Sequence, residues 1–344
     1  VELILSPMAE DAKESIGSMG DDTPLAVLSD IYRPLSHHFR QNFAQVTNPP
    51  IDPLRETRVM GLKTRFRNLR NILAEGEVQT KEMLVLDSPV MTNGMMDRFL
   101  GLVNTKARVI DCTFPVPAID ARPGQGIQAA LDRIRSEGEQ AVKDGIENIV
   151  LCDKAVDADN AGVPMILAVG ALQTHLVSKG LRSSCSILVR TAECMDTHYF
   201  AVLIGAGATA VNAYMAQDSI SDRVNRGLLD MSTDEAVAQY KLAIEGGLLK
   251  IISKIGISVI SSYRGGNNFE ALGLSRALVG ENFPGMKSRI SGIGLAGLEV
   301  KILEAHDAAY DSAVVRLPVG GLYRVRAKGE RHAYKAEMIH MLQE

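Results

Sequence analysis

The run Glu147-Asn-Ile-Val-Leu-Cys152 is short, almost wholly apolar and rich in β-branched side chains, and it predicts a buried strand. Residues 126–144 before it predict an amphipathic helix, because apolar positions recur there at helical spacing: Ile127, Ala130, Leu131, Ile134 and Val142. Ahead of that helix, Ala107-Arg-Val-Ile-Asp-Cys-Thr113 predicts another strand. A strand, a helix and a strand in this order are typical of a βαβ unit with parallel strands.

The alternation of predicted strands and helices continues on the C-terminal side. Further strands are predicted at 163–168, 186–190 and 208–215, and helices at 172–179 and 233–255, the last interrupted at Gly246-Gly247. We therefore expect an α/β fold of parallel-sheet βα repeats, either barrel-like or open, with its core over residues 106–280. An irregular N-terminal region is expected over 1–105, where turn formers are dense, and a Gly-rich, irregular extension from about residue 280.

Composition excludes several classes of protein. The 344 residues are 46% hydrophobic and 23% charged, with a formal charge of −4. No long basic run marks a nucleic-acid binder, and the most basic stretch, 63–70, is expected to be solvated or to face a partner. No apolar run is long enough to span a bilayer, and no signal peptide is evident, so we expect no membrane contact and a cytoplasmic location.

The cysteines and histidines form no recognisable site. Four cysteines occur without C-x-x-C spacing, which favours buried free thiols over a metal or iron–sulfur site. His37 and His38 are adjacent and therefore point in different directions. His198 lies in an apolar helical segment and is expected to be packed rather than to bind a metal. Asp21-Asp22 before Thr23-Pro24 favours a helix start over an acid–base pair.

Two glycine motifs could indicate a nucleotide or flavin site. Gly205-Ala-Gly-Ala-Thr-Ala210 follows a helical pattern and precedes a strand-like segment, so that its glycines are expected to end a helix. A phosphate needs the opposite order, strand then helix. Gly292-Ile-Gly-Leu-Ala-Gly297 matches G-x-G-x-x-G, but the residues before it, 284–290, do not predict a good strand.

The strongest local signal is Phe43-Ala-Gln-Val-Thr-Asn-Pro-Pro-Ile-Asp-Pro-Leu-Arg-Glu56. Consecutive prolines favour an extended, rigid path, from which neighbouring amides and hydroxyls would project. Such a segment suits a polar passage or an interface, and an ordinary connecting loop remains the alternative.

This segment and several others resemble the glutamate synthase family. The resembling stretches, which occur in the family's order, are Gly17-Ser-Met-Gly-Asp-Asp-Thr-Pro-Leu-Ala-Val-Leu-Ser29, residues 40–56, Ser253-Lys-Ile-Gly-Ile-Ser258, Ser262-Tyr-Arg-Gly265 and Phe269-Glu-Ala-Leu-Gly-Leu274. The resemblance is to the domain between the glutaminase and FMN-binding domains. It implies a central domain over 1–310 and a tail, 311–344, similar to the start of the FMN-binding domain. Residues 265–268 read Gly-Gly-Asn-Asn where many relatives have Gly-Ala-Gln.

The resemblance also implies a function. The family makes glutamate from glutamine and 2-oxoglutarate, and passes ammonia between its two active sites through an internal tunnel. The implied role of this part is to scaffold the glutaminase and FMN domains of the same polypeptide. FMN and an iron–sulfur cluster are expected outside this chain, and no cofactor or metal within it. The implied electron donor is a small subunit or ferredoxin.

Residues expected to line or border the tunnel are Gln45, Thr47, Asn48, Pro49, Pro50 and Ile51, while Asp52 and Arg55 are expected to hold the segment in place. The alternative from another class is a free-standing α/β enzyme that binds a flavin or a phosphate-bearing ligand through one of the glycine motifs.

Overall fold

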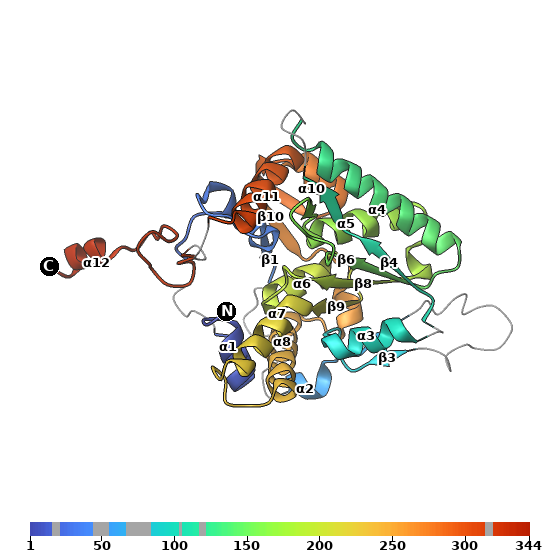
Figure 1. The fold of residues 1–344 in the computed structure, drawn as a ribbon, viewed down its shortest axis with the longest axis horizontal. Coiled ribbons are helices and arrows are strands. Elements are labelled where there is room, and N and C mark those ends of the chain that lie inside the picture. Colours follow the sequence, from blue (N-terminus) through green and yellow to red (C-terminus); the bar gives the residue numbers. More distant parts are fainter. Residues whose placement is uncertain (16–20, 44–54, 67–83, 103–104, 117–121, 314–318) are drawn as a thin grey trace.

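The computed structural model describes residues 1–15, 21–43, 55–66, 84–102, 105–116, 122–313 and 319–344. Its centre is a sheet of four parallel strands in the order β4-β6-β8-β9, with bounds Ala107–Asp111, Asn148–Cys152, Ser186–Thr191 and Ala210–Ala213 (Figure 1). The predicted α/β fold with parallel βα repeats is confirmed. Among the described strands β4 and β9 are the two edges, so this sheet is open.

The two faces of the sheet are buried in separate apolar clusters. Val150, Leu188 and Ala210 face a smaller cluster with Phe66, Met91, Met96 and Phe99. Ile149, Leu151, Ile187, Val189 and Val211 point into the main core. This alternation follows from the two-residue period of a strand. It also explains why all of β6 is apolar or buried, since neither face of this strand meets water.

The long helices between residues 125 and 255 are α4 Gln125–Lys143, α5 Met165–Ser178, α6 Thr197–Ala206, α7 Tyr214–Asn225 and α8 Thr233–Ile255. Helix α5 contacts both α4 and α6, and α8 contacts both α6 and α7. Close packing depends on small residues. A Cβ on Gly138 of α4 would lie 2.3 Å from Leu172 Cδ1 of α5, so that only glycine permits this approach.

Two predictions in this region are wrong. The run 163–168 is not a strand, because α5 begins at Met165 directly after Pro164. A helix buried on all sides is apolar all round, and a short piece of it cannot be told from a buried strand by periodicity. The interruption at Gly246-Gly247 is also absent, because α8 continues through both residues. Gly247 instead lets α8 approach Thr197, whose Cγ2 would lie 2.5 Å from an added Cβ.

A second sheet contains β1 Phe39–Gln41, β10 Phe269–Leu274 and β11 Lys287–Ile293. Strand β1 pairs antiparallel with β10, and β10 pairs parallel with β11. Helix α10, Arg276–Asn282, connects β10 to β11, and α11, Leu295–Tyr310, follows β11. The segment after residue 280 is therefore regular up to Tyr310, and its prediction as irregular is wrong there.

The remaining elements are short. They are α1 Leu5–Asp11, η1 Ala26–Leu28, η2 Leu35–His38, α2 Glu56–Val59, β2 Thr64–Arg65, β3 Val85–Leu86, α3 Asn93–Gly101, β5 Thr113–Pro115, β7 Asn160–Gly162, η5 Arg182–Ser184, α9 Ile260–Tyr263 and α12 Ala336–Gln343. Helix α12 projects from the body with the C-terminus (Figure 1). No helix in the described ranges has the length and apolar content to cross a membrane. All four cysteines are buried and free, as predicted.

Candidate functional site

The predicted tunnel residues lie almost entirely outside the described residues. Gln45, Thr47, Asn48, Pro49, Pro50, Ile51 and Asp52 belong to the undescribed segment 44–54, and their predicted roles stay predictions. Arg55 is described, and it is an exposed residue directly before α2. The chain on either side of 44–54 is described as well, and it shows where the segment is attached.

The N-terminal flank of 44–54 is attached to the residues between α9 and β10. Past β1, the Asn42 N–H donates to Asn268 O at 3.0 Å. The Gln41 Nε2 donates to the Tyr263 hydroxyl at 2.8 Å. Burial raises the pKa of Tyr263, so the phenol stays neutral and fixes the amide.

The C-terminal flank is attached to the end of α8 and the start of α9. The Ser253 hydroxyl donates to Glu56 Oε1 at 2.9 Å. The Gly61 N–H donates to Ser258 O at 2.8 Å, and Gly61 O accepts from the Ile260 N–H at 3.0 Å. Both ends of 44–54 therefore rest on one stretch, 253–268, which we call the loop base.

The loop base is itself fixed on the C-terminal end of α6. The Gly265 N–H donates to Ile204 O at 3.0 Å, and the Asn267 N–H donates to Gly205 O at 3.1 Å. A Cβ on Gly205 would lie 2.4 Å from Phe269 Cε2. Gly207, with a φ of 131°, ends α6 before β9, which confirms the predicted order of helix, glycine turn and strand.

Aromatic rings make this region rigid. Phe269 contacts Phe39, Tyr263 and His198 in edge-on geometry. The His198 Nε2 lies 3.0 Å from Ser36 O, so this histidine is packed and hydrogen-bonded, as predicted. The described ends of the stretch 40–56 thus contact the stretches 253–258 and 262–274, which the resemblance also singled out.

The second glycine motif has a structural role in this chain. Strand β11 leads through Gly294 into α11, so the expectation of a poor strand before it is wrong. However, a Cβ on Gly292 would lie 2.1 Å from Gly273 O, and one on Gly297 would lie 2.9 Å from Ile293 Cβ. The first glycine of the motif therefore allows β11 to pack closely against β10, and the last allows α11 to pack against β11.

Two acids lie at the carboxyl ends of β6 and β8, of which Asp153 is buried and Glu193 is half-buried. Asp153 accepts hydrogen bonds from the Thr191 hydroxyl at 2.6 Å and the Ala192 N–H at 3.0 Å. Glu193 accepts from the Met165 N–H at the start of α5, at 3.0 Å, and from the Tyr199 hydroxyl. Burial raises the pKa of Glu193 to about 7 and also raises that of Asp153. These bonds join the ends of β6 and β8 to each other and to helices α5 and α6. Among the described residues no group of His, Cys, Asp and Glu is arranged to hold a metal ion.

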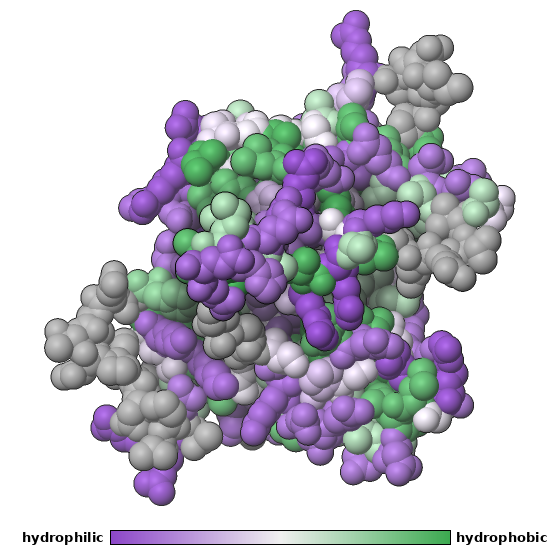
Figure 2. All heavy atoms as spheres, turned by 90° about the vertical axis from the view of Figure 1, so that its left-hand side faces the viewer, coloured by the Kyte–Doolittle hydropathy of each residue, from purple (hydrophilic) through white to green (hydrophobic). Residues whose placement is uncertain are grey.

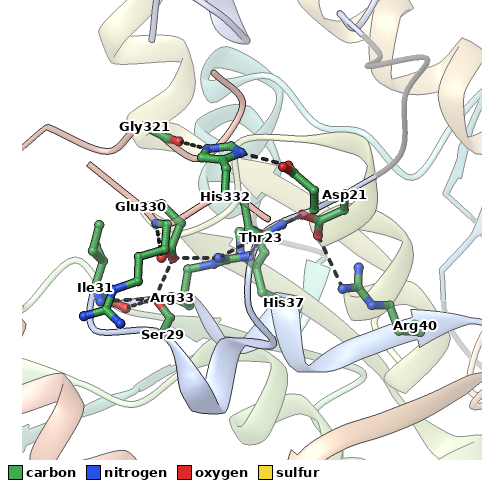
Figure 3. Close-up of polar contacts among 12 residues, drawn as sticks. Asp21, Thr23, Ser29, Ile31, Arg33, His37, Arg40, Gly321, Glu330 and His332 are labelled. Carbon is green, nitrogen blue, oxygen red and sulfur yellow. Dashed lines mark hydrogen bonds and ion pairs between the residues drawn. The ribbon is translucent and has the colours of Figure 1, made fainter. Parts of the chain in front are cut away.

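A second feature joins the two ends of the described chain, and we call it the polar junction (Figure 3). His332 lies between Asp22 Oδ1, 2.8 Å from its Nδ1, and Gly321 O, 2.7 Å from its Nε2. A carboxylate and a carbonyl oxygen can only accept, so both ring nitrogens must donate and the imidazole is protonated. Accordingly, the Gly321 carbonyl and the Asp22 carboxylate raise the pKa of His332.

The buried part of the polar junction centres on Arg33. Its guanidinium donates to Glu330 Oε2 at 2.9 Å and to His37 Nδ1 at 2.9 Å, and the Ser29 hydroxyl also donates to Glu330, at 2.6 Å. The exposed fractions of the Arg33 and Glu330 side chains are only 7% and 2%. Burial and the Arg33 charge lower the pKa of His37 to about 3, which leaves its Nδ1 free to accept.

The prediction of a helix start at Asp21-Asp22 is wrong. Asp21-Asp22 was expected to start a helix, but Asp21 accepts from Thr23 and Asp22 binds His332, and the next helical turn, η1, begins only at Ala26. No local pattern can indicate a contact between residues 310 positions apart.

Fold and site together define an α/β domain in which both described flanks of 44–54 are hydrogen-bonded to the loop base. A family model described as glutamate synthase central domain matches residues 1–275. The chain belongs to this family.

Similar proteins agree with the family model. The chain is 58% identical over 345 residues to a glutamate synthase [NADPH] large chain of Azospirillum brasilense and 36% identical to that of Bacillus subtilis. It is 37% identical to a ferredoxin-dependent glutamate synthase of Pyropia yezoensis. These alignments cover 99% or more of the chain but only 22–23% of each relative, so the chain spans about a fifth of their length.

Among solved structures, a mandelate oxidase bound to (S)-2-phenylpropionate aligns with 78% of this chain and 94% of its own. Sequence identity is 10% and the TM-score 0.30, values at which the likeness supports no conclusion about function.

Proposed function

We propose that this chain is the central, non-catalytic part of a glutamate synthase large chain. It would hold the glutaminase and synthase parts of the same polypeptide in position and border a passage for ammonia between them. FMN and an iron–sulfur cluster would be bound by other parts, and electrons would come from a small subunit or from ferredoxin. Residues 311–344 would lead into the FMN-binding part.

The observation that carries this proposal is the attachment of 44–54. Both flanks of the segment are hydrogen-bonded to the loop base, which in turn is fixed on α6. A segment fastened at both ends by buried phenol, amide and backbone groups can hold a fixed surface. Membership of the central-domain family supports the assignment to the synthase.

The residue types in segment 44–54 suit a passage for a neutral molecule. Ammonia is small and uncharged, so a passage for it requires a few polar groups and the exclusion of bulk water rather than fixed charges. Gln45, Thr47 and Asn48 offer amides and a hydroxyl, and Pro49, Pro50 and Ile51 offer an apolar wall. Asp52 and Arg55, the charged members, would stabilise the segment from outside the passage.

The test uses Asn48→Trp in the full-length polypeptide, with Asn225→Trp as the matched control, since Asn225 is exposed at the end of α7. Glutamine hydrolysed is measured against 2-oxoglutarate consumed. The two should stay equal in the wild type and the control, and hydrolysis should exceed consumption in Asn48→Trp. Equal consumption in all three proteins would remove 44–54 from the passage.

The rival reading is a free-standing flavin or nucleotide enzyme. It predicts that the purified 344-residue chain retains added FMN through a desalting column. Our proposal predicts that the flavin is separated and the protein stays colourless.

A further inference from the structure

Arg264 belongs to the loop base, and Arg182 lies on a segment that meets it through Gln173. Arg182 begins η5, and Arg264 directly follows α9. Arg182 donates to Gln173 Oε1, to Cys185 O at 2.6 Å and to Gly207 O at 2.9 Å. Gln173 also reaches the residue after Arg264, because a Cβ on Gly265 would lie 3.3 Å from its Nε2. Both guanidinium groups are only partly exposed.

Neither arginine has a counter-charge in the described part of the chain. The three acceptors of Arg182 are neutral carbonyl oxygens. The Arg264 side chain makes no hydrogen bond and no ion pair among the described residues. In contrast, carboxylates bind ten other arginines of the described chain: Arg33, Arg40, Arg108, Arg133, Arg135, Arg190, Arg223, Arg226, Arg289 and Arg331.

The electrostatic interaction between Arg182 and Arg264 is unfavourable. Burial lowers the pKa of both arginines, and the charge of Arg182 lowers the pKa of Arg264 further. Two like charges in a partly desolvated place repel each other more strongly than in water. A bound anion would remove this cost.

The donor geometry also fits an anion. A guanidinium has five N–H groups in a planar fork that matches the oxygens of a carboxylate, a phosphate or a sulfate. Arg182 uses three of its five on carbonyls, and all five of Arg264 are unused by described residues.

We propose that Arg182 and Arg264 form a binding site for an oxyanion, of the carboxylate or sulfate type, next to the loop base. Two sources share this chemistry: a free anion from solution, or an Asp or Glu side chain from another part of the full-length polypeptide. The site does not depend on the passage of ammonia, and either idea can fail without the other.

Sulfate is the probe. It is titrated into the 344-residue chain at constant ionic strength, set with sodium chloride, and followed through the side-chain Nε–H signals of arginine in ¹H–¹⁵N NMR spectra. Saturable shifts are expected in the wild type. Arg264→Gln should weaken sulfate binding at least about tenfold, as the loss of charged hydrogen bonds implies. Arg276→Gln, an exposed arginine on α10, should leave it unchanged. Arg264→Lys keeps the charge but loses the fork and should give an intermediate affinity.

The proposal is overturned if sulfate does not saturate, or if Arg264→Gln and Arg276→Gln bind it equally. The same titration on the full-length polypeptide separates the two sources. Persisting sulfate binding indicates a free anion. Loss of binding, together with a lower melting temperature for Arg264→Gln than for Arg276→Gln, indicates a side-chain carboxylate. Loss of binding with equal melting temperatures contradicts the site.

Discussion

Replacing Glu193 with glutamine should make the protein more stable than the wild type at pH 8. This advantage in unfolding free energy should become smaller as the pH falls. Glu193 lies against the start of α5, where one carboxylate oxygen accepts from both the Met165 N–H and the Tyr199 hydroxyl. A glutamine can keep that accepting oxygen while it loses the ability to ionise.

The size of the effect follows from the pKa. Burial raises the pKa of Glu193 from 4.5 to about 7 in the folded chain. The folded state therefore binds the proton more tightly than the unfolded state. The contribution of Glu193 protonation to the unfolding free energy is at its full value below pH 4.5 and is lost as the pH rises through about 7. At 1.36 kcal/mol per pKa unit, the wild type should lose about 2–3 kcal/mol relative to Glu193→Gln between pH 5 and pH 8.

The assay is urea unfolding of both proteins at pH 5, 6, 7 and 8, followed by far-ultraviolet circular dichroism. The difference in unfolding free energy between the two proteins is the quantity of interest, because all other titrating groups are common to both. A difference that does not change with pH, or one that grows in favour of the wild type at high pH, would refute the reasoning.

Two further pairs of substitutions test the packing and the polar junction. Glu330→Ala should cost about 3–5 kcal/mol because it leaves the buried Arg33 without its counter-charge, whereas Asp30→Ala, from an exposed ion pair, should cost less than about 1 kcal/mol. Equal unfolding free energies for the two variants would argue against a buried junction. Gly205→Ala should lower the melting temperature, since its Cβ would lie 2.4 Å from an aromatic carbon, and should cost about 1–3 kcal/mol. Gly246→Ala faces open space inside α8 and should instead stabilise by about 1 kcal/mol; a gain at both positions would contradict the tight contact.

Local patterns predicted the elements that have a distinctive period, length or composition. Helix α4 has one buried face and polar residues opposite, so its period identified it. Strand β6 is short and lies between a predicted helix and a loop, so its length and β-branched content sufficed. Helix α5 was misread because it is buried nearly all round and therefore shows no period.

Local sequence patterns could not predict the contacts between segments that are distant in the chain. The G-x-G-x-x-G match at 292–297 does not reveal that Gly292 packs against Gly273 on the neighbouring strand. Likewise, Asp22 and Arg33 gain their roles only from His332 and Glu330 near the other end of the chain. The resemblance rests on 40–56 and on stretches within 253–274, and in the fold the described flanks of 44–54 are hydrogen-bonded to 253–268.

The most direct test of the central claim is an isotope competition in the full-length polypeptide. Glutamine labelled with ¹⁵N in its amide is supplied with excess unlabelled ammonium, and the label in newly formed glutamate is measured by mass spectrometry. Our account predicts undiluted label in the wild type and in Asn225→Trp, and label diluted by solution ammonium in Asn48→Trp. Diluted label in the wild type, or undiluted label at full rate in Asn48→Trp, would contradict it.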